Sequence, residues 1–153
     1  MIKKKKRILV IIWLIASFNS CVMDSWYPLY VTNNTNHSIS FSFFSSNGVY
    51  YPDTLLKNID YIFKNIIPES RFSYDSGLSW DKIFSSYPND TMSFFIFHPD
   101  TLKKYSWYQI CDKYMILKRY DLSLADLKRL DMNISYPPDE RMKDMKMYPP
   151  YGQ

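Results

Sequence analysis

The chain has 153 residues, of which 46% are hydrophobic, so it is long enough to form one domain with its own core. This apolar content argues against intrinsic disorder. The formal net charge of +4 arises from the first twenty residues, which hold five basic and no acidic side chains. The remaining residues have 14 Lys and Arg against 15 Asp and Glu, so no basic excess indicates a nucleic-acid partner.

The first twenty residues have the order of an export signal. Residues 3–7 are all Lys or Arg, residues 8–16 are an unbroken apolar run, and small and polar residues follow. As a helix, nine residues would rise about 14 Å, roughly half of the hydrocarbon thickness of a bilayer. We therefore expect a removable signal peptide rather than a permanent membrane span.

The sequence Phe18-Asn19-Ser20-Cys21 resembles the lipobox at which lipoprotein signals are cut. Ordinary signal peptidase prefers a small residue at the third position before the cut, where bulky Phe18 stands. We therefore predict a lipoprotein signal peptide at 1–20, acylation of Cys21 with palmitate-type chains, and a tether at 21–28. Eight extended residues reach at most about 26 Å, which keeps the domain close to its membrane. The alternative is simple secretion, in which Cys21 forms a disulfide with Cys111; otherwise Cys111 is a small, buried, unpaired thiol.

The first half of the mature chain predicts strands. Residues 29–32 and 39–44 read as two strands joined by a polar turn, since Ile39, Phe41 and Phe43 alternate with serines. Residues 54–67 fit either a helix or a loop that leads into a strand, and we favour the second. Residues 79–84 have the pattern of a short helix that begins after Ser79.

The second half mixes strands with short helices. Residues 92–97 are continuously apolar and predict a central strand covered on both faces. Short helices are predicted at 99–105, after the capping box of Ser106 and Gln109, and after Ser123. Further strands are expected at 114–120 and 133–136, followed by a tail with no strand pairing of its own. The predicted fold is a single α+β domain at 29–153, strand-rich, with a mostly antiparallel sheet or small sandwich and three or four short helices.

Several short segments resemble a group of small uncharacterised cell-envelope lipoproteins of Bacteroidetes-type bacteria. This resemblance implies a periplasmic or outer-membrane location and carries no catalytic residue. Surface-exposed lipoproteins of such bacteria have an acidic cluster after the lipidated cysteine, whereas here only Asp24 is acidic, which favours a periplasm-facing domain. The segments are Tyr51-Pro52-Asp53-Thr54, Ser79-Trp80 to Phe84, Asp90-Thr91 to Phe97, Tyr105-Ser106-Trp107, residues 117–122, Tyr136-Pro137-Pro138 and Met147-Tyr148-Pro149-Pro150.

Residues for catalysis or metal binding are sparse. His37 and His98 are the only histidines, and no nucleophile motif accompanies them, so we interpret both as structural or solvated. Met142, Met145 and Met147 suit Cu(I) by their thioethers, yet no His or Cys stands beside them, so we expect a packed or frayed tail. No cofactor and no metal site are predicted.

Two kinds of surface site are expected. Thr54, Thr91 and Thr101 each follow Asp and precede an apolar residue, a pattern that resembles O-glycosylation acceptors of Bacteroidetes envelopes; the alternative is that Asp-Thr begins turns and helices. Four aromatic residues are candidates for a platform that stacks on sugar rings, with core packing as the alternative. They are Trp26, Trp80, Trp107 and Tyr108.

The function predicted from these observations is that of a non-catalytic, lipid-anchored envelope protein. It would bind an envelope protein, another envelope component or a glycan, and lie at the outer membrane facing the periplasm. The alternative is a small periplasmic hydrolase whose site is assembled from dispersed residues.

Overall fold

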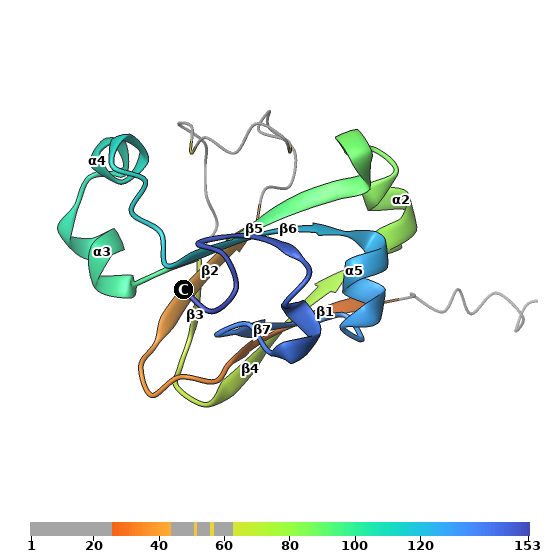
Figure 1. The fold of residues 1–153 in the computed structure, drawn as a ribbon, viewed down its shortest axis with the longest axis horizontal. Helices are drawn as coiled ribbons and strands as arrows, with labels where there is room; N and C mark the ends of the chain where they lie inside the picture. The colour runs from red at the N-terminus through yellow and green to blue at the C-terminus, as the bar shows by residue number, and fades with distance from the viewer. Residues whose placement is uncertain (1–25, 44–50, 52–55, 57–62) are drawn as a thin grey trace, which may run out of the picture.

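The computed structural model describes residues 26–43, 51, 56 and 63–153. These residues form two sheets that face each other across a core, with short helices around them (Figure 1). One sheet has the strand order β4-β1-β7 and the other β3-β2-β5-β6-β8. Among the described strands, β1–β7 is the only parallel pair. The prediction of a strand-rich, mostly antiparallel α+β fold is therefore confirmed.

The smaller sheet is built on β1 (Tyr27–Asn33). Its partner β4 (Ser70–Ser76) is antiparallel to it, and β7 (Asn133–Tyr136) lies on its other side. Leu29 and Val31 are fully buried and alternate with half-buried residues, the period expected of a strand with one face in the core. The sequence analysis did not predict β4, in which Phe72 and Tyr74 are the only large apolar residues.

The larger sheet is centred on β5 (Thr91–Phe97), whose seven residues are all buried. The strand pairs with β2 (Ile39–Phe43) on one side and β6 (Lys118–Ser123) on the other. β3 (Lys64–Ile66) and β8 (Lys146–Tyr148) form the two edges. The prediction of a central, doubly covered strand is confirmed.

Two hydrophobic cores lie on opposite faces of β5. Met92, Phe94 and Ile96 belong to the main core, which fills the space between the sheets. Phe95 and Phe97 belong to a second, smaller core on the outer face. That core is covered by α3 (Pro99–Lys104) and α4 (Trp107–Asp112), which project at one end of the molecule (Figure 1).

The predicted helix starts are confirmed by their caps. The hydroxyl of Ser79 accepts a hydrogen bond from the first turn of α2 (Trp80–Phe84). Ser106 before α4 and Ser123 before α5 (Leu124–Arg129) each form a full capping box. Two short 3₁₀ helices, η1 (Pro88–Asp90) and η2 (Glu140–Met142), complete the described helices. Among all the described residues, no helix is both long enough and hydrophobic enough to span a bilayer.

Three segments differ from or refine the predictions. β6 begins at Lys118 rather than at residue 114, because Tyr114 has a left-handed backbone (φ 49°) that ends α4. The tail was expected to be without a pairing partner, and this is wrong: β8 pairs with β6, with Tyr148 opposite Arg119. Of residues 54–67, the structure describes 56 and 63–67, where β3 agrees with the preferred loop-and-strand interpretation.

Asn33 ties the turn after β1 to the segment between β3 and β4. Its buried amide nitrogen donates to the carbonyls of His37 (2.8 Å), Ile66 (3.2 Å) and Ile67 (3.0 Å), and its oxygen accepts from Thr35. Because Asn33→Ala removes the buried amide that joins these two segments, including its hydrogen bond to the buried carbonyl of Ile66, we expect it to lower the free energy of unfolding by about 2–3 kcal/mol. Asn36→Ala, at an exposed position of the same turn, should change it by less than about 0.5 kcal/mol. Urea denaturation of both variants measures this, and equal stabilities would refute the role assigned to Asn33.

Candidate functional site

A pocket lined mainly by aromatic and aliphatic side chains opens where β4 runs into α2. We call it the aromatic pocket; its volume is about 320 Å³. α2, which contributes Trp80 and Ile83 to its wall, lies at the end of the molecule opposite α3 and α4 (Figure 1). Its walls come from β2, β4, α2, β5 and the segments beside them. The lining residues are Phe43, Tyr74, Ser76, Gly77, Leu78, Trp80, Ile83, Tyr87 and Met92.

The link between β4 and α2 is fixed by local hydrogen bonds. The hydroxyl of Ser76 donates to the carbonyl of Leu78 (2.8 Å) and accepts from its backbone N–H (3.1 Å). This tight turn directs the chain into the Ser79 cap and places Trp80 in the first turn of α2. The indole N–H of Trp80 then donates to the carbonyl of Tyr27 (3.1 Å), which ties α2 to the start of β1.

Aromatic rings pack on one another around the pocket. The rings of Phe43 and Tyr74 meet edge to face, with centroids 4.8 Å apart, and Tyr74 is 6.2 Å from Trp80. Trp80 also contacts Phe84, which in turn contacts Tyr87. Such pairs stabilise the wall beyond simple area burial, so the pocket is formed before any ligand arrives.

The chemistry of the aromatic pocket suits an apolar group. Among the described residues, the nine that line it include no Asp, Glu, His, Lys, Arg or Cys, so they offer neither a charge at neutral pH nor a general base. The hydroxyl of Ser76 and the indole N–H of Trp80 are already bonded to backbone groups. A ligand rich in hydroxyl groups would therefore lose hydrogen bonds to water without full replacement.

The predicted aromatic platform is not assembled, and this prediction was wrong. Trp80 is only 5% exposed and lies in the core and the pocket wall. Trp107 is half-buried against Phe63 and Phe97, with ring centroids at 5.8 and 6.1 Å. Trp26 and Tyr108 are exposed, but they lie at opposite ends of the molecule, because β1 begins far from α4 (Figure 1). Burial of indole rings in cores separated the four residues.

The two histidines come together, although no local sequence pattern predicted this. The rings of His37 and His98 are stacked, with centroids 5.9 Å apart. His98 accepts a hydrogen bond from the backbone N–H of Asp100 (3.2 Å) and thereby caps α3. Neither histidine lines the aromatic pocket. Within the described residues, no group of three or more His, Cys, Asp or Glu is placed to hold a metal ion.

The remaining candidate residues have structural surroundings. Thr91 is buried and its hydroxyl donates to the carbonyl of Asn89 (2.8 Å), which disfavours it as a glycan acceptor. Thr101 is half-buried on α3, and Thr54 lies outside the described residues. The methionine tail is packed, as expected: Met142 and Met145 are buried in the main core and Met147 packs against it.

Of the two cysteines, the structure describes Cys111. Cys111 is a free thiol on α4, packed against the second core, and burial raises its pKa. Cys21 lies outside the described residues. Cys21 is five positions before Trp26 in the sequence, and α4 lies at the end of the domain opposite the start of β1 (Figure 1). This arrangement disfavours the Cys21–Cys111 disulfide.

A polar cluster on the outer face of the larger sheet was also missed. Buried Asp121 accepts hydrogen bonds from Ser93 (2.6 Å) and from Arg119 (3.0 Å). Arg119 also bonds to the hydroxyl of Tyr114 and lies against the ring of Tyr148. With its hydrogen bonds made within the protein, the cluster joins β5, β6 and β8 rather than presenting a reactive group. The alternation of polar residues in β6 was the available signal.

Comparisons with protein-family models, with curated proteins and with solved structures found no match. The function of this domain is therefore inferred from the chemistry of its own residues.

The two readings of Trp80, core residue and surface platform, differ in their effect on stability. Because Trp80 is buried and bonded to Tyr27, we expect Trp80→Ala to lower the free energy of unfolding by about 3–5 kcal/mol. Tyr108→Ala, at a side chain that is 77% exposed, should change it by less than about 0.5 kcal/mol. Urea denaturation followed by circular dichroism measures both. A loss below about 1 kcal/mol for Trp80→Ala would contradict its assignment to the core.

Proposed function

We propose that this protein is a non-catalytic, lipid-anchored envelope protein that binds an apolar group of another envelope component in the aromatic pocket. The observation that carries the proposal is the pocket itself, a hollow walled by four aromatic rings and closed by aliphatic side chains. Preformed apolar concavities are the usual binding sites of small domains. Because the lining side chains are mainly aromatic and aliphatic, we expect the bound group to be an acyl chain or an apolar side chain.

The anchor is proposed from the sequence, and the fold is consistent with it. The apolar run at 8–16 and the lipobox-like Phe18-Asn19-Ser20-Cys21 support acylation of Cys21. The described domain begins at Trp26, and the Trp80–Tyr27 hydrogen bond places the aromatic pocket beside this end of the chain. A protein held at Cys21 would therefore carry its pocket near the bilayer, at the outer membrane facing the periplasm.

The chemistry of the pocket favours an apolar ligand over the other proposals. Sugar hydroxyls would need hydrogen-bond partners, and the hydroxyl of Ser76 and the indole N–H of Trp80 are already bonded to backbone carbonyls. A hydrolase would need a nucleophile and a base within hydrogen-bonding reach, and the lining residues supply no base. An apolar ligand would pack against the aromatic and aliphatic side chains of the pocket without needing a new hydrogen bond.

A charge placed in the wall tests the binding site. Ile83 lines the pocket and is half-buried, so the carboxylate of Ile83→Asp would be partly desolvated beside the ligand. We expect the affinity for the apolar dye N-phenyl-1-naphthylamine to fall about tenfold, equivalent to ~1.4 kcal/mol. The matched control is Ile67→Asp, at a side chain that is 66% exposed and does not line the pocket.

Dye fluorescence titrations with the parent and both variants measure the three affinities and show whether the dye binds in the aromatic pocket. The parent and Ile67→Asp should bind with equal affinity, and dodecanoate should compete with the dye. Equal affinities for all three proteins, or equal losses in both variants, would place the dye elsewhere and reject the aromatic pocket as the site.

The anchor is tested separately by intact mass spectrometry. We expect the parent protein expressed in a Gram-negative host to carry acyl mass on Cys21 and to accumulate as an unprocessed form when globomycin is added. Cys21→Ala should carry no acyl mass and should not respond to globomycin. Identical processing of the two proteins, with no acyl mass on the parent, would end the assignment of a lipid anchor.

A further inference from the structure

We propose that the end of the domain formed by Trp26 and Leu78 docks onto the lipid interface of the bilayer that holds the protein. This inference rests on the anchor of the proposed function and adds an orientation to it: the aromatic pocket would open toward the lipid rather than toward the periplasm. The partner is the bilayer interface, recognised through apolar contacts. We call this end the Trp26 surface.

Two of the large exposed apolar side chains lie at the Trp26 surface. Trp26 is 64% exposed and Leu78 is 51% exposed. The antiparallel register pairs Tyr27 with Ser76, so Trp26 and Leu78 each lie just past the same end of the β1–β4 pair. The other exposed large apolar side chains of the described residues are on separate elements: Ile67 lies between β3 and β4, Tyr108 on α4 and Tyr148 on β8.

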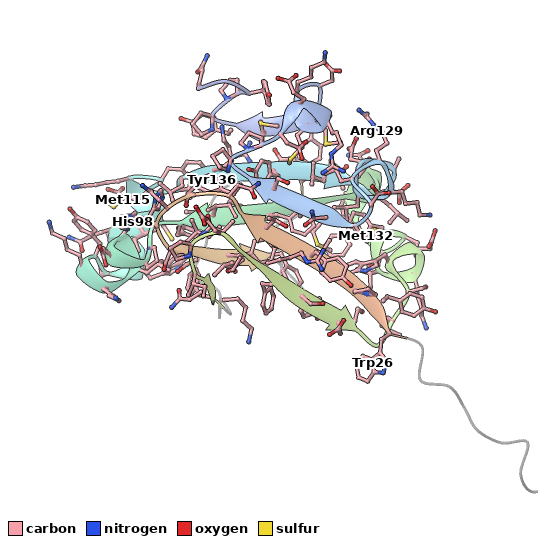
Figure 2. All side chains as sticks on the ribbon, turned by 90° about the horizontal axis from the view of Figure 1, so that it is seen from below. Trp26, His98, Met115, Arg129, Met132 and Tyr136 are labelled. Carbon is pink, nitrogen blue, oxygen red and sulfur yellow. The ribbon has the colours of Figure 1, made fainter. Side chains whose placement is uncertain are left out.

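The proposed lipid anchor at Cys21 is close in sequence to the Trp26 surface, so the bilayer is the partner nearest to it. Figure 2 shows Trp26 at the outer tip of β1, where the described part of the chain begins. Residues 21–25 span at most about 17 Å when fully extended. A lipid on Cys21 therefore brings Trp26 within that distance of the membrane, wherever the rest of the domain points.

The chemistry of the two side chains suits the interface. Tryptophan is favoured at the level of the lipid headgroups, where its ring is apolar and its N–H finds polar partners. Leucine adds aliphatic area that can enter the acyl boundary. The mature chain has 14 basic against 15 acidic residues, so no net positive charge attracts it to anionic lipid. Docking should therefore depend little on salt.

Leu78 connects docking with ligand binding, because it belongs both to the Trp26 surface and to the wall of the aromatic pocket. With the surface against lipid, the mouth of the pocket beside Leu78 would face the acyl boundary. A group that enters the pocket would then come from the bilayer itself, which narrows the proposed apolar ligand to a lipid-borne acyl chain.

Tryptophan quenching by brominated lipid tests the orientation. The full chain, expressed in a Gram-negative host and purified in its processed form, is reconstituted into phosphatidylcholine vesicles with and without brominated acyl chains. Removal of residues 1–20 leaves three tryptophans, Trp26, Trp80 and Trp107. We expect a loss of emission in brominated vesicles that is present in Trp107→Phe, clearly smaller in Trp26→Phe, reduced in Leu78→Ser and unchanged by 0.5 M NaCl. The loss that remains in Trp26→Phe is assigned to Trp80, which an acyl chain in the aromatic pocket would contact.

Flotation of the same vesicles separates the two proposals. Flotation with quenching that depends on Trp26 supports the docked orientation. Flotation with no quenching, or with quenching as strong in Trp26→Phe as in the parent, overturns the docked orientation and leaves the lipid anchor standing. A protein that does not float has no anchor, which overturns the anchor of the proposed function and this inference together.

Discussion

The fold depends on the burial of β5 on both faces. All seven of its residues are buried, and its side chains alternate between the core that joins the two sheets and the smaller core under α3 and α4. Because a one-residue shift in pairing would exchange these two sets, the strand fixes the register of both its neighbours. That register sets the positions of β2 and β6, and with them the part of the pocket wall that Phe43 and Met92 form.

The two ends of the molecule differ as a consequence. At one end, β5 continues directly into His98 and α3, and the second core is closed by α4. At the other end, the strand begins beside η1 and α2, where Met92 forms part of the aromatic pocket. The chain enters the domain at this second end, at Trp26 (Figure 2). The proposed anchor, the proposed pocket and the proposed docking surface therefore share one end of a small, electrically near-neutral domain.

Polar groups inside the fold act as joints between elements. Asn33 links two turns, Asp121 links three strands through Ser93 and Arg119, and the ammonium group of Lys118 donates to the carbonyls of Pro149, Pro150 and Gln153. Burial lowers the pKa of Lys118, while these carbonyls receive its hydrogen bonds. Such satisfied polar contacts specify one arrangement of strands, since a displaced strand would leave buried groups without partners. They explain why the tail forms β8 instead of remaining unpaired.

Features that depend on neighbouring residues could be predicted from the sequence alone. Alternation in 39–43, the continuous apolar run at 92–97 and the serine caps at Ser79, Ser106 and Ser123 all predicted the elements that formed, because caps and strand faces are set within a few residues. Only the tertiary structure decided which distant residues meet. It separated Trp26, Trp80, Trp107 and Tyr108, stacked His37 on His98, and brought Phe43, Tyr74 and Trp80 around one pocket. An aromatic side chain has the same local pattern in a core, in a pocket wall and on a surface, so its role is settled by strand order and sheet packing, which the local pattern does not encode.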